Sequence, residues 1–208
     1  MTATPEQLDQ LKAFGTATIY EAQGAIGALD SGMKPIDPTT RFAGSALTVD
    51  MRPADNLTLH IALEAAKPGD VLVVDAKGFL EAGPWGDVLT LQAMELGLAA
   101  FVIDGCVRDA NDIIAAGFPV FCRGLSIKST EKKARGMINV PVIVGGVRIA
   151  PGDILVGDRD GLVVVAKDSV AASIEASERR VQKEEDMRAA IRSGKTTAQL
   201  LGVSETTT

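Results

Sequence analysis

Residues 85–113 read WGDVLTLQAMELGLAAFVIDGCVRDANDI, and this stretch decides the fold class. Residues 86–97 have the composition of a helix that ends at Gly97, and residues 98–105 form an apolar run that is typical of a buried strand. A second helical run over residues 108–117 follows directly and ends at Gly117. A strand set between helices of about ten residues predicts an α/β core.

The same alternation continues on both sides of this stretch. We expect strands over residues 41–53, 69–76 and 118–124, and helices over residues 5–14 and 55–69, with a short helix or turn over residues 16–25. Thr4 is a possible N-cap of the first helix, and Gly15 would end that helix.

The second half of the chain changes character. Residues 140–166 carry three apolar β-rich runs joined by turns at Pro151-Gly152 and Asp160-Gly161, which favour an antiparallel or mixed sheet. Residues 168–193 form one long charged helix, and residues 202–208 look frayed. We therefore expect a layered α/β sandwich in a single domain of residues 1–208, with residues 168–193 as a C-terminal helical arm.

Composition limits the kinds of ligand and compartment. The net charge of −6 argues against nucleic acid as the main ligand, because phosphate binding needs clustered Lys and Arg. Cys106 and Cys122 match no zinc or disulfide spacing, so we interpret them as small buried hydrophobic residues in a reduced, cytoplasmic protein. The N-terminal residues lack the pattern of a signal peptide, and no apolar run is long enough to span a membrane.

The first candidate motif is Gly86-Asp87-Val88-Leu89, at the start of a predicted helix. The first N–H groups of a helix have no intrahelical acceptor, and together with the helix dipole they bind anions. The alternative is that Asp87 only complements the helix dipole. On its own, this motif favours the alternative.

The second candidate motif is the run Arg108-Asp109-Ala110-Asn111-Asp112, which follows a strand and opens a helix. Ligand crevices form at the carboxyl ends of such strands. Asp109 could ligate a hard divalent cation, Asp112 could hold a metal-bound water, and Arg108 offers a planar fork for a carboxylate or enolate oxygen. The alternative is a helix start with two stabilising acids and a solvated Arg.

Both motifs lie at junctions that lead into helices of consecutive units, so they can face one another. One would bind a carboxylate through backbone N–H groups, and the other would add a cation and an Arg. This combination suits a 2-oxo acid, which chelates a metal through its carboxylate and keto oxygens.

The sequence also resembles the RraA-like family, which includes class II aldolases that cleave 4-hydroxy-4-methyl-2-oxoglutarate and 4-carboxy-4-hydroxy-2-oxoadipate. The resemblance runs through most of the chain, in the stretches TATIYEAQG, FAGSALTV, KPGDVLVVDAKG, WGDVL, VIDGCVRD, FPVF, VPVIVGG, PGDILVGDRDGLVVV and RRVQKE.

The resemblance implies a role for each site residue. The backbone of Gly86, Asp87, Val88 and Leu89 would bind the carboxylate of pyruvate, and Arg108 would bind its keto oxygen. Asp109 would bind Mg²⁺ or Mn²⁺, with Asp112 acting through water and Asp87 assisting catalysis.

The resemblance also implies that a Glu from the C-terminal helix of a neighbouring subunit completes each site, in a homotrimer or homohexamer. The matching residue is Glu184. Independently, Ile174, Val181, Arg188 and Ile191 share one stripe of this helix, close to Glu184. Without the resemblance, Glu184 would be read as one of many solvated charges.

Three lesser signals are interpreted as structural. His60, the only histidine, lies in an apolar helix and is expected to pack or to make a local hydrogen bond rather than act as a base. SGKTT, residues 193–197, lacks the first glycine and the preceding strand of a P-loop. Residues 158–161 are expected to form a hairpin turn rather than a cation-binding loop.

The expected function is a divalent-metal-dependent cleavage of a 4-hydroxy-2-oxo diacid to pyruvate and a second oxo acid, with oxaloacetate decarboxylation as a side activity. Two alternatives stay open at this stage: an enzyme that is primarily an oxaloacetate decarboxylase, and a non-catalytic regulator of ribonuclease activity.

Overall fold

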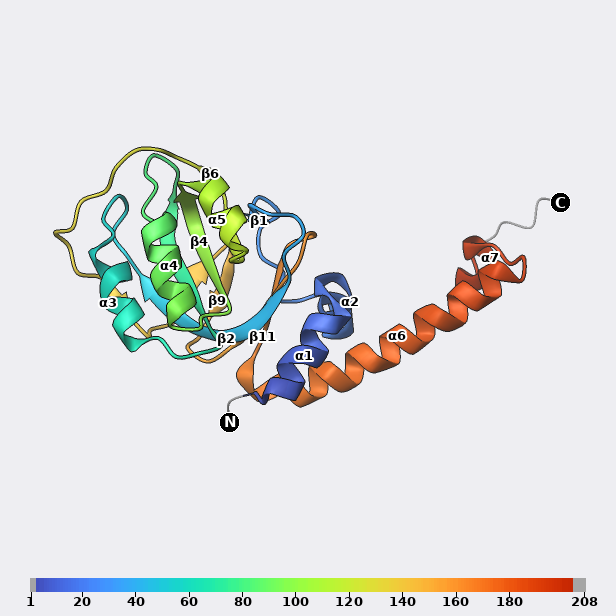
Figure 1. Cartoon of the computed structure of the whole chain (residues 1–208). Coiled ribbons are helices and arrows are strands. Elements are labelled where there is room, and N and C mark those ends of the chain that lie inside the picture. The colour runs from blue at the N-terminus through green and yellow to red at the C-terminus, as the bar shows by residue number, and fades with distance from the viewer. Residues whose placement is uncertain (1–2, 204–208) are drawn as a thin grey trace.

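Parallel strands joined by helices form the centre of the structure, a computed structural model that describes residues 3–203. Strands β2 (Phe42–Asp50), β3 (Asp70–Phe79), β4 (Ala100–Val107) and β5 (Val120–Cys122) pair in parallel in this order. The connecting helices α3 (Leu57–Ala65), α4 (Asp87–Glu95) and α5 (Ala110–Ala116) lie together on one face of the sheet (Figure 1). The α/β core predicted from the alternating pattern is confirmed.

The central strands are apolar on both faces, because each face is covered. In β3, Leu72 and Val74 belong to the cluster that includes the helices α3, α4 and α5. Val71 and Val73 alternate with them and pack into a second cluster on the opposite face. This twofold alternation is the side-chain period of a strand, and it places one core on each side of the sheet.

The C-terminal strands extend and cover this sheet. β10 (Ile154–Gly157) pairs antiparallel with β2 and with β11 (Leu162–Val165). A separate antiparallel hairpin, β8 (Val142–Val144) and β9 (Val147–Ile149), joins the second core. Three short strands complete the pairing: β1 (Lys34–Pro35), β6 (Gly124–Leu125) and β7 (Met137–Ile138).

The expected mixed or antiparallel C-terminal sheet is therefore confirmed, with one difference in detail. The three predicted runs are four strands, because Gly145 and Gly146 both have positive φ and fold residues 142–149 into a hairpin. The turn before β11 spans residues 158–161, as expected, since Gly157 pairs with Leu162.

Three helices pack on the outer face of β10 and β11: α1 (Pro5–Phe14), α2 (Thr16–Ala22) and α6 (Val170–Arg192). The Thr4 side chain caps α1, as the sequence predicted, and it forms a capping box with Gln7. The buried Asp158 carboxylate accepts hydrogen bonds from the Thr16 N–H at 2.8 Å and the Thr16 hydroxyl at 2.7 Å. The hairpin turn thus holds the start of α2. This agrees with the expectation that residues 158–161 form a structural turn rather than a cation-binding loop.

The predicted C-terminal helix is present, and most of its length projects away from the sheet (Figure 1). A short 3-10 turn, Lys167–Ser169, precedes α6, and a further helix, α7 (Thr197–Leu201), was not predicted. Residues 202 and 203 follow α7, and residues 204–208 lie outside the described residues. Between residues 3 and 203, no helix combines the length and apolar character needed to cross a membrane.

Candidate functional site

The two motifs singled out in the sequence meet at one edge of the sheet. Parallel strands β3 and β4 are neighbours, and their carboxyl ends lead into α4 and α5, respectively. The starts of both helices therefore lie at the same edge of the sheet, at the carboxyl ends of the strands. Open α/β sheets form ligand crevices at this edge. Residues 86–89 form the start of α4, and Arg108 and Asp109 directly follow β4.

Trp85 fixes the start of α4 against the sheet. Its indole is fully buried and stacks on Phe101 of β4, with ring centroids 3.8 Å apart. The indole N–H donates to the Thr90 hydroxyl at 2.7 Å, and the Trp85 carbonyl accepts a hydrogen bond from the Arg108 N–H at 2.9 Å. These contacts tie the beginning of α4 directly to the residue that follows β4.

The first turn of α4 presents main-chain N–H groups. Gly86 is its N-cap, and glycine has no side chain that could accept a hydrogen bond from these groups. The Asp87 N–H lies 3.3 Å from Oδ2 of Asp109, a long contact that leaves the rest of the turn to an incoming acceptor. A helix start arranged in this way binds an anion through N–H groups and the helix dipole.

Asp109 adopts an uncommon backbone conformation. Its φ of 56° and ψ of 37° are left-handed, which Asp tolerates better than most residues but which still stores strain. It is the N-cap of α5, yet within residues 3–203 its side chain makes no capping bond to that helix. The carboxylate instead reaches α4 and lies 3.5 Å from Nε of Arg108.

The contact between the two helix starts leaves no room at Gly86. A Cβ atom there would lie 2.2 Å from Oδ2 of Asp109 and 3.2 Å from Nε of Arg108. Gly86 is therefore required for the close approach of the Asp109 carboxylate to α4.

A cavity of about 230 Å³ opens beside these groups. This volume is below the range of about 300–1,000 Å³ that holds drug-sized ligands, so it suits a small acid. Its lining residues are Asn56, His60, Pro84, Gly86, Asp87, Val88, Leu89, Arg108 and Lys132. The structure thus brings residues 86–89 and Arg108 together on one cavity, with Asp109 in contact with both.

The donor groups at this cavity fit a hydrated magnesium or manganese ion rather than a metal caged by protein. Among residues 3–203, no three His, Cys, Asp or Glu side chains are grouped so that they could hold a metal. Asp109 offers one carboxylate whose contacts at 3.3 and 3.5 Å leave its oxygens available. Mg²⁺ is commonly bound by one or two carboxylates, several waters and substrate oxygens.

Three predicted site residues are absent from the cavity lining in the described chain: Asp109, Asp112 and Glu184. Asp109 still contacts the α4 start and Arg108, whereas the other two lie further away in the chain. Asp112 is exposed in the first turn of α5, three residues after Asp109. Glu184 is in α6, where it pairs with Arg180 at 3.2 Å and with Arg188 at 2.8 Å. Neither residue lines the cavity within one chain.

Asn56, His60 and Lys132 line the same cavity, although no sequence pattern marks them as functional. His60 was expected to pack or to make a local hydrogen bond. Its Nε2 is buried, but it has no hydrogen-bond partner among residues 3–203. Burial, assisted by the nearby charge of Lys132, lowers the pKa of His60, so its imidazole is neutral near pH 7.

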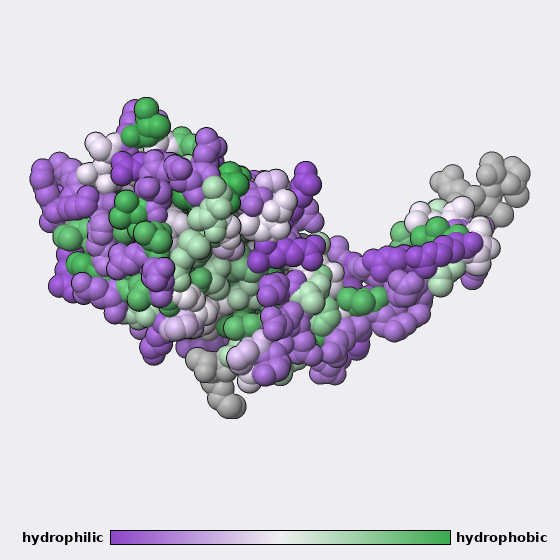
Figure 2. Space-filling model, in the orientation of Figure 1, coloured by the Kyte–Doolittle hydropathy of each residue, from purple (hydrophilic) through white to green (hydrophobic). Residues whose placement is uncertain are grey.

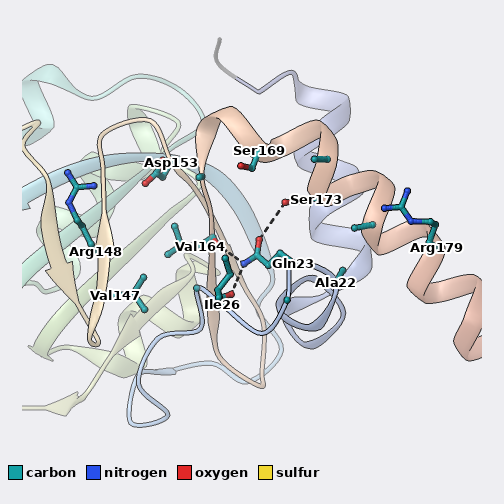
Figure 3. A pocket seen from close by; sticks show the side chains of 15 residues that line it. Ala22, Gln23, Ile26, Val147, Arg148, Asp153, Val164, Ser169, Ser173 and Arg179 are labelled. Atoms are coloured by element: carbon teal, nitrogen blue, oxygen red, sulfur yellow. Dashed lines mark hydrogen bonds between the residues drawn. The ribbon is translucent and has the colours of Figure 1, made fainter. Parts of the chain in front are cut away.

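Both cysteines and a second cavity lie outside this site. Cys106 and Cys122 are buried as predicted, and burial raises the pKa of Cys122 to about 11, which leaves its thiol protonated. A further cavity, of about 750 Å³, lies between α2, α6 and the C-terminal strands (Figure 3). There Gln23 donates to the carbonyls of Ile26 and Val164, so its amide group is already engaged.

Comparison with known proteins shows which family and fold this chain resembles. A family model described as RraA-like, Aldolase/RraA, matches residues 16–164. A relative from Halalkalibacterium halodurans, named "Putative 4-hydroxy-4-methyl-2-oxoglutarate aldolase", is 38% identical over 184 residues, covering 88% of each chain.

Two solved structures share the fold over nearly their full lengths. A protein from Pseudomonas syringae pv. tomato is 31% identical, with a TM-score of 0.82 and coverage of 96% of this chain and 98% of its own. Streptomyces coelicolor RraAS2, described as an unusual member of the RNase ES inhibitor RraA family, is also 31% identical. Its TM-score is 0.79, with coverage of 90% of this chain and 98% of its own.

Proposed function

Because the chain belongs to the RraA-like family, we propose that it cleaves a 4-hydroxy-2-oxo diacid to pyruvate and a second oxo acid, with Mg²⁺ or Mn²⁺. The observation that carries this proposal is the meeting of the α4 start, Arg108 and Asp109 at one small cavity. The name of the H. halodurans relative supports a carbon–carbon lyase of this substrate class.

The pyruvyl end of the substrate binds at the two helix starts. Its carboxylate accepts hydrogen bonds from the N–H groups of residues 87–89, and the helix dipole favours its negative charge. Arg108 donates to the keto oxygen. Asp109 would hold the metal directly and Asp112 would act through a bound water, and the metal would polarise the keto oxygen.

Cleavage begins when a base removes the proton of the substrate's 4-hydroxyl group. The electron pair of that O–H bond forms the new carbonyl, and the bond between C3 and C4 breaks. The electrons of the broken bond pass to the pyruvyl half as an enolate, whose oxygen Arg108 stabilises through charge-assisted hydrogen bonds. Protonation of the enolate carbon then gives pyruvate.

The proton transfers pass through water held by Asp87 or Glu184, the carboxylates assigned to this role. No lysine is needed to form a Schiff base, because Arg108 stabilises the enolate oxygen. Loss of CO₂ from oxaloacetate produces the same enolate, so we expect oxaloacetate decarboxylation as a second activity.

The active form is proposed to be a trimer or hexamer in which Glu184 reaches the site of a neighbouring subunit. Most of α6 projects from the body of the subunit, and its apolar residues Val181 and Ile191 are 40% and 43% exposed. Beside the cavity, α4 exposes Val88 and Leu91. Figure 2 shows apolar groups between polar ones on the face that carries α4 in Figure 1. These exposed apolar side chains on α4 and α6 are available for a contact between subunits.

Two further functions compete with this proposal. The first is a regulator that binds a ribonuclease, which is favoured by the description of the S. coelicolor neighbour as an RNase ES inhibitor family member. The second is an enzyme that is primarily an oxaloacetate decarboxylase. A pure binding module does not need an Arg108 that lines a cavity and pairs with Asp109 beside it, so the geometry favours an enzyme over a regulator.

A pyruvate-release assay with 4-hydroxy-4-methyl-2-oxoglutarate tests the proposal. We expect EDTA to abolish release, and Mg²⁺ or Mn²⁺ to restore it. Asp109→Asn should be inactive at every metal concentration, whereas Asp168→Asn, in the exposed turn before α6, should behave as wild type. Undiminished activity after metal removal would contradict the role of Asp109. Activity on oxaloacetate alone would favour the decarboxylase.

A further inference from the structure

The side chain of Arg108 lies along a buried stretch of backbone, Gly83-Pro84-Trp85-Gly86, which leads into α4. An added Cβ at Gly83 would lie 3.1 Å from Cβ and 3.4 Å from Cγ of Arg108, and one at Gly86 would lie 3.2 Å from its Nε. The stem of Arg108 therefore packs on Gly83, and its guanidinium end lies at Gly86, which lines the cavity. Residues 83–86 thus set the direction in which this side chain points.

A second segment, residues 126–128, closes the other side of Gly83. It follows β6, the strand that pairs in parallel with the end of β4. The Ser126 N–H donates to the Val107 carbonyl at 2.9 Å, and the Gly83 N–H donates to the Lys128 carbonyl, also at 2.9 Å. The two segments approach so closely that a Cβ at Gly83 would lie 2.2 Å from the Ser126 carbonyl oxygen. Position 83 therefore has no room for a side chain.

The segments on both sides of this close approach are bonded to the backbone at Arg108. Ser126 is bonded to Val107, the residue before Arg108, and the carbonyl of Trp85, two residues after Gly83, accepts a hydrogen bond from the Arg108 N–H at 2.9 Å. A side chain at position 83 must push the two segments apart. Because Arg108 is tied to both of them, displacement of either segment moves it.

We propose that Gly83 is a positioning residue for the cleavage reaction: it seats the stem of Arg108, so that the guanidinium group faces the cavity where the enolate oxygen forms. This role rests on the proposed function, because it takes Arg108 to stabilise the enolate. Gly83 itself does not line the cavity in the described chain, so it acts through Arg108. Its replacement should therefore lower kcat, and the affinity for an analogue of the enolate, more than the affinity for the substrate.

Oxalate reports on Arg108 without any turnover, because its second carboxylate carries negative charge where the enolate of pyruvate has its oxygen. In calorimetry with Mg²⁺ present, Gly83→Ala should bind oxalate about tenfold or more weakly than wild type, the scale of one charge-assisted hydrogen bond. The kcat for pyruvate release should fall by about 10²-fold, since the added Cβ and the Ser126 oxygen must separate by about 1 Å more. The KM should rise by much less, because the α4 N–H groups hold the carboxylate of the substrate.

A double variant separates action through Arg108 from a general loss of structure. Arg108→Ala removes both the stem beyond Cβ and the guanidinium group that Gly83 is proposed to seat. Adding Gly83→Ala to it should therefore weaken oxalate binding by less than about twofold, because effects that act through one group are not additive. A further loss as large as that in the wild-type background would overturn the positioning role.

Gly44→Ala is the matched control for the steric clash. A Cβ at Gly44 would lie 2.6 Å from the Gly69 carbonyl oxygen, so this substitution also forces two backbone segments apart. Gly44 is near the amino end of β2, at the edge of the sheet opposite the cavity. We expect Gly44→Ala to lower the Tm but to bind oxalate as wild type does. Equal losses of oxalate affinity in Gly44→Ala and Gly83→Ala would overturn the proposal, because they would assign the effect to general strain.

Pro84→Ala provides a second variant should Gly83→Ala fail to fold. Proline fixes its own φ and restricts the residue before it, so alanine frees the backbone at Gly83 without adding an atom beside Arg108. Oxalate binding should weaken by about twofold to fivefold, the scale of the freedom that one proline removes, and this loss should disappear in the Arg108→Ala background. A folded Pro84→Ala variant that binds oxalate as tightly as wild type would overturn the seat of Arg108. A wild-type protein that releases no pyruvate would overturn the proposed function, whereas the oxalate comparison still decides whether Gly83 positions Arg108.

Discussion

One added methyl group at Gly86 should disable the site and leave the fold nearly unchanged. In Gly86→Ala, the new Cβ would lie 2.2 Å from Oδ2 of Asp109. The carboxylate must therefore move by about 1 Å to reach an ordinary non-bonded contact. The backbone itself accepts alanine, because Gly86 has an extended conformation with φ −148° and ψ −164°.

The magnitude follows from this displacement. A misplacement of about 1 Å at a reacting group costs about 10²-fold in rate, so we expect kcat/KM for pyruvate release to fall by about 10²-fold. Replacement of an N-cap residue by alanine costs about 1 kcal/mol at most. The lower entropy of the unfolded alanine chain offsets about 0.4–1 kcal/mol of this cost. The Tm should therefore change by no more than about 2–4 °C.

The matched control is Gly124→Ala in β6. Its backbone is also free of positive φ, and the added Cβ would meet only Sγ of Cys106 at 3.6 Å, an ordinary contact. This variant should keep wild-type activity. The assays are pyruvate release, Mn²⁺ titration by calorimetry and thermal melting. Wild-type kcat/KM and wild-type Mn²⁺ affinity in Gly86→Ala would refute the reasoning, because they would mean that the two helix starts do not meet as described.

Three further outcomes can be measured. Arg108→Ala should lower kcat by about 10²-fold or more, and Arg108→Lys should recover little of it because a point charge does not replace the planar fork; a fully active lysine variant would exclude this role. Glu184→Ala and Arg108→Ala should each be inactive, yet regain partial activity when mixed under conditions of subunit exchange; inactive mixtures whose subunits have exchanged would argue against a shared site. Because the pKa of His60 is lowered in the folded protein, its contribution to stability is complete above the ordinary histidine pKa of about 6.5 and is lost as the pH falls below it. Urea unfolding between about pH 7.5 and about pH 5.5 should thus show a shallower decline in His60→Gln than in wild type, and equal slopes would contradict the direction of the shift.

Much of the fold could be predicted because its signals are local. The strand and helix over residues 98–117 are marked by an apolar run and by Gly117, and both lie within a few residues of the predicted bounds. Residues 86–89 and 108–109 could be identified for a similar reason. Each motif is contiguous, and the carboxyl ends of neighbouring parallel strands bring the two motifs together.

The remainder depends on contacts that no local pattern records. Lys132 comes to the cavity only because a buried Asp55 binds the N–H groups of the residues after it. Asn56 gives no signal in the sequence, because its orientation at the cavity depends on the hydrogen bond that its Nδ2 donates to the Pro84 carbonyl. The short helix α7 was missed, since Gly194 and Lys195 interrupt the charged pattern directly before it.

The proposed site uses backbone donors in the first turn of α4 and a side-chain donor beside it, and substitutions affect these two kinds of donor differently. Peptide N–H groups meet the carboxylate of the substrate there, and every residue except proline brings such a group to its position. Changes at the exposed Asp87 and Val88 can therefore alter the surroundings of the carboxylate without removing its donors. The keto oxygen, in contrast, is met by the side chain of Arg108, which one substitution replaces. A variant can therefore lose the contact to the keto oxygen while the fold itself retains the contacts to the carboxylate.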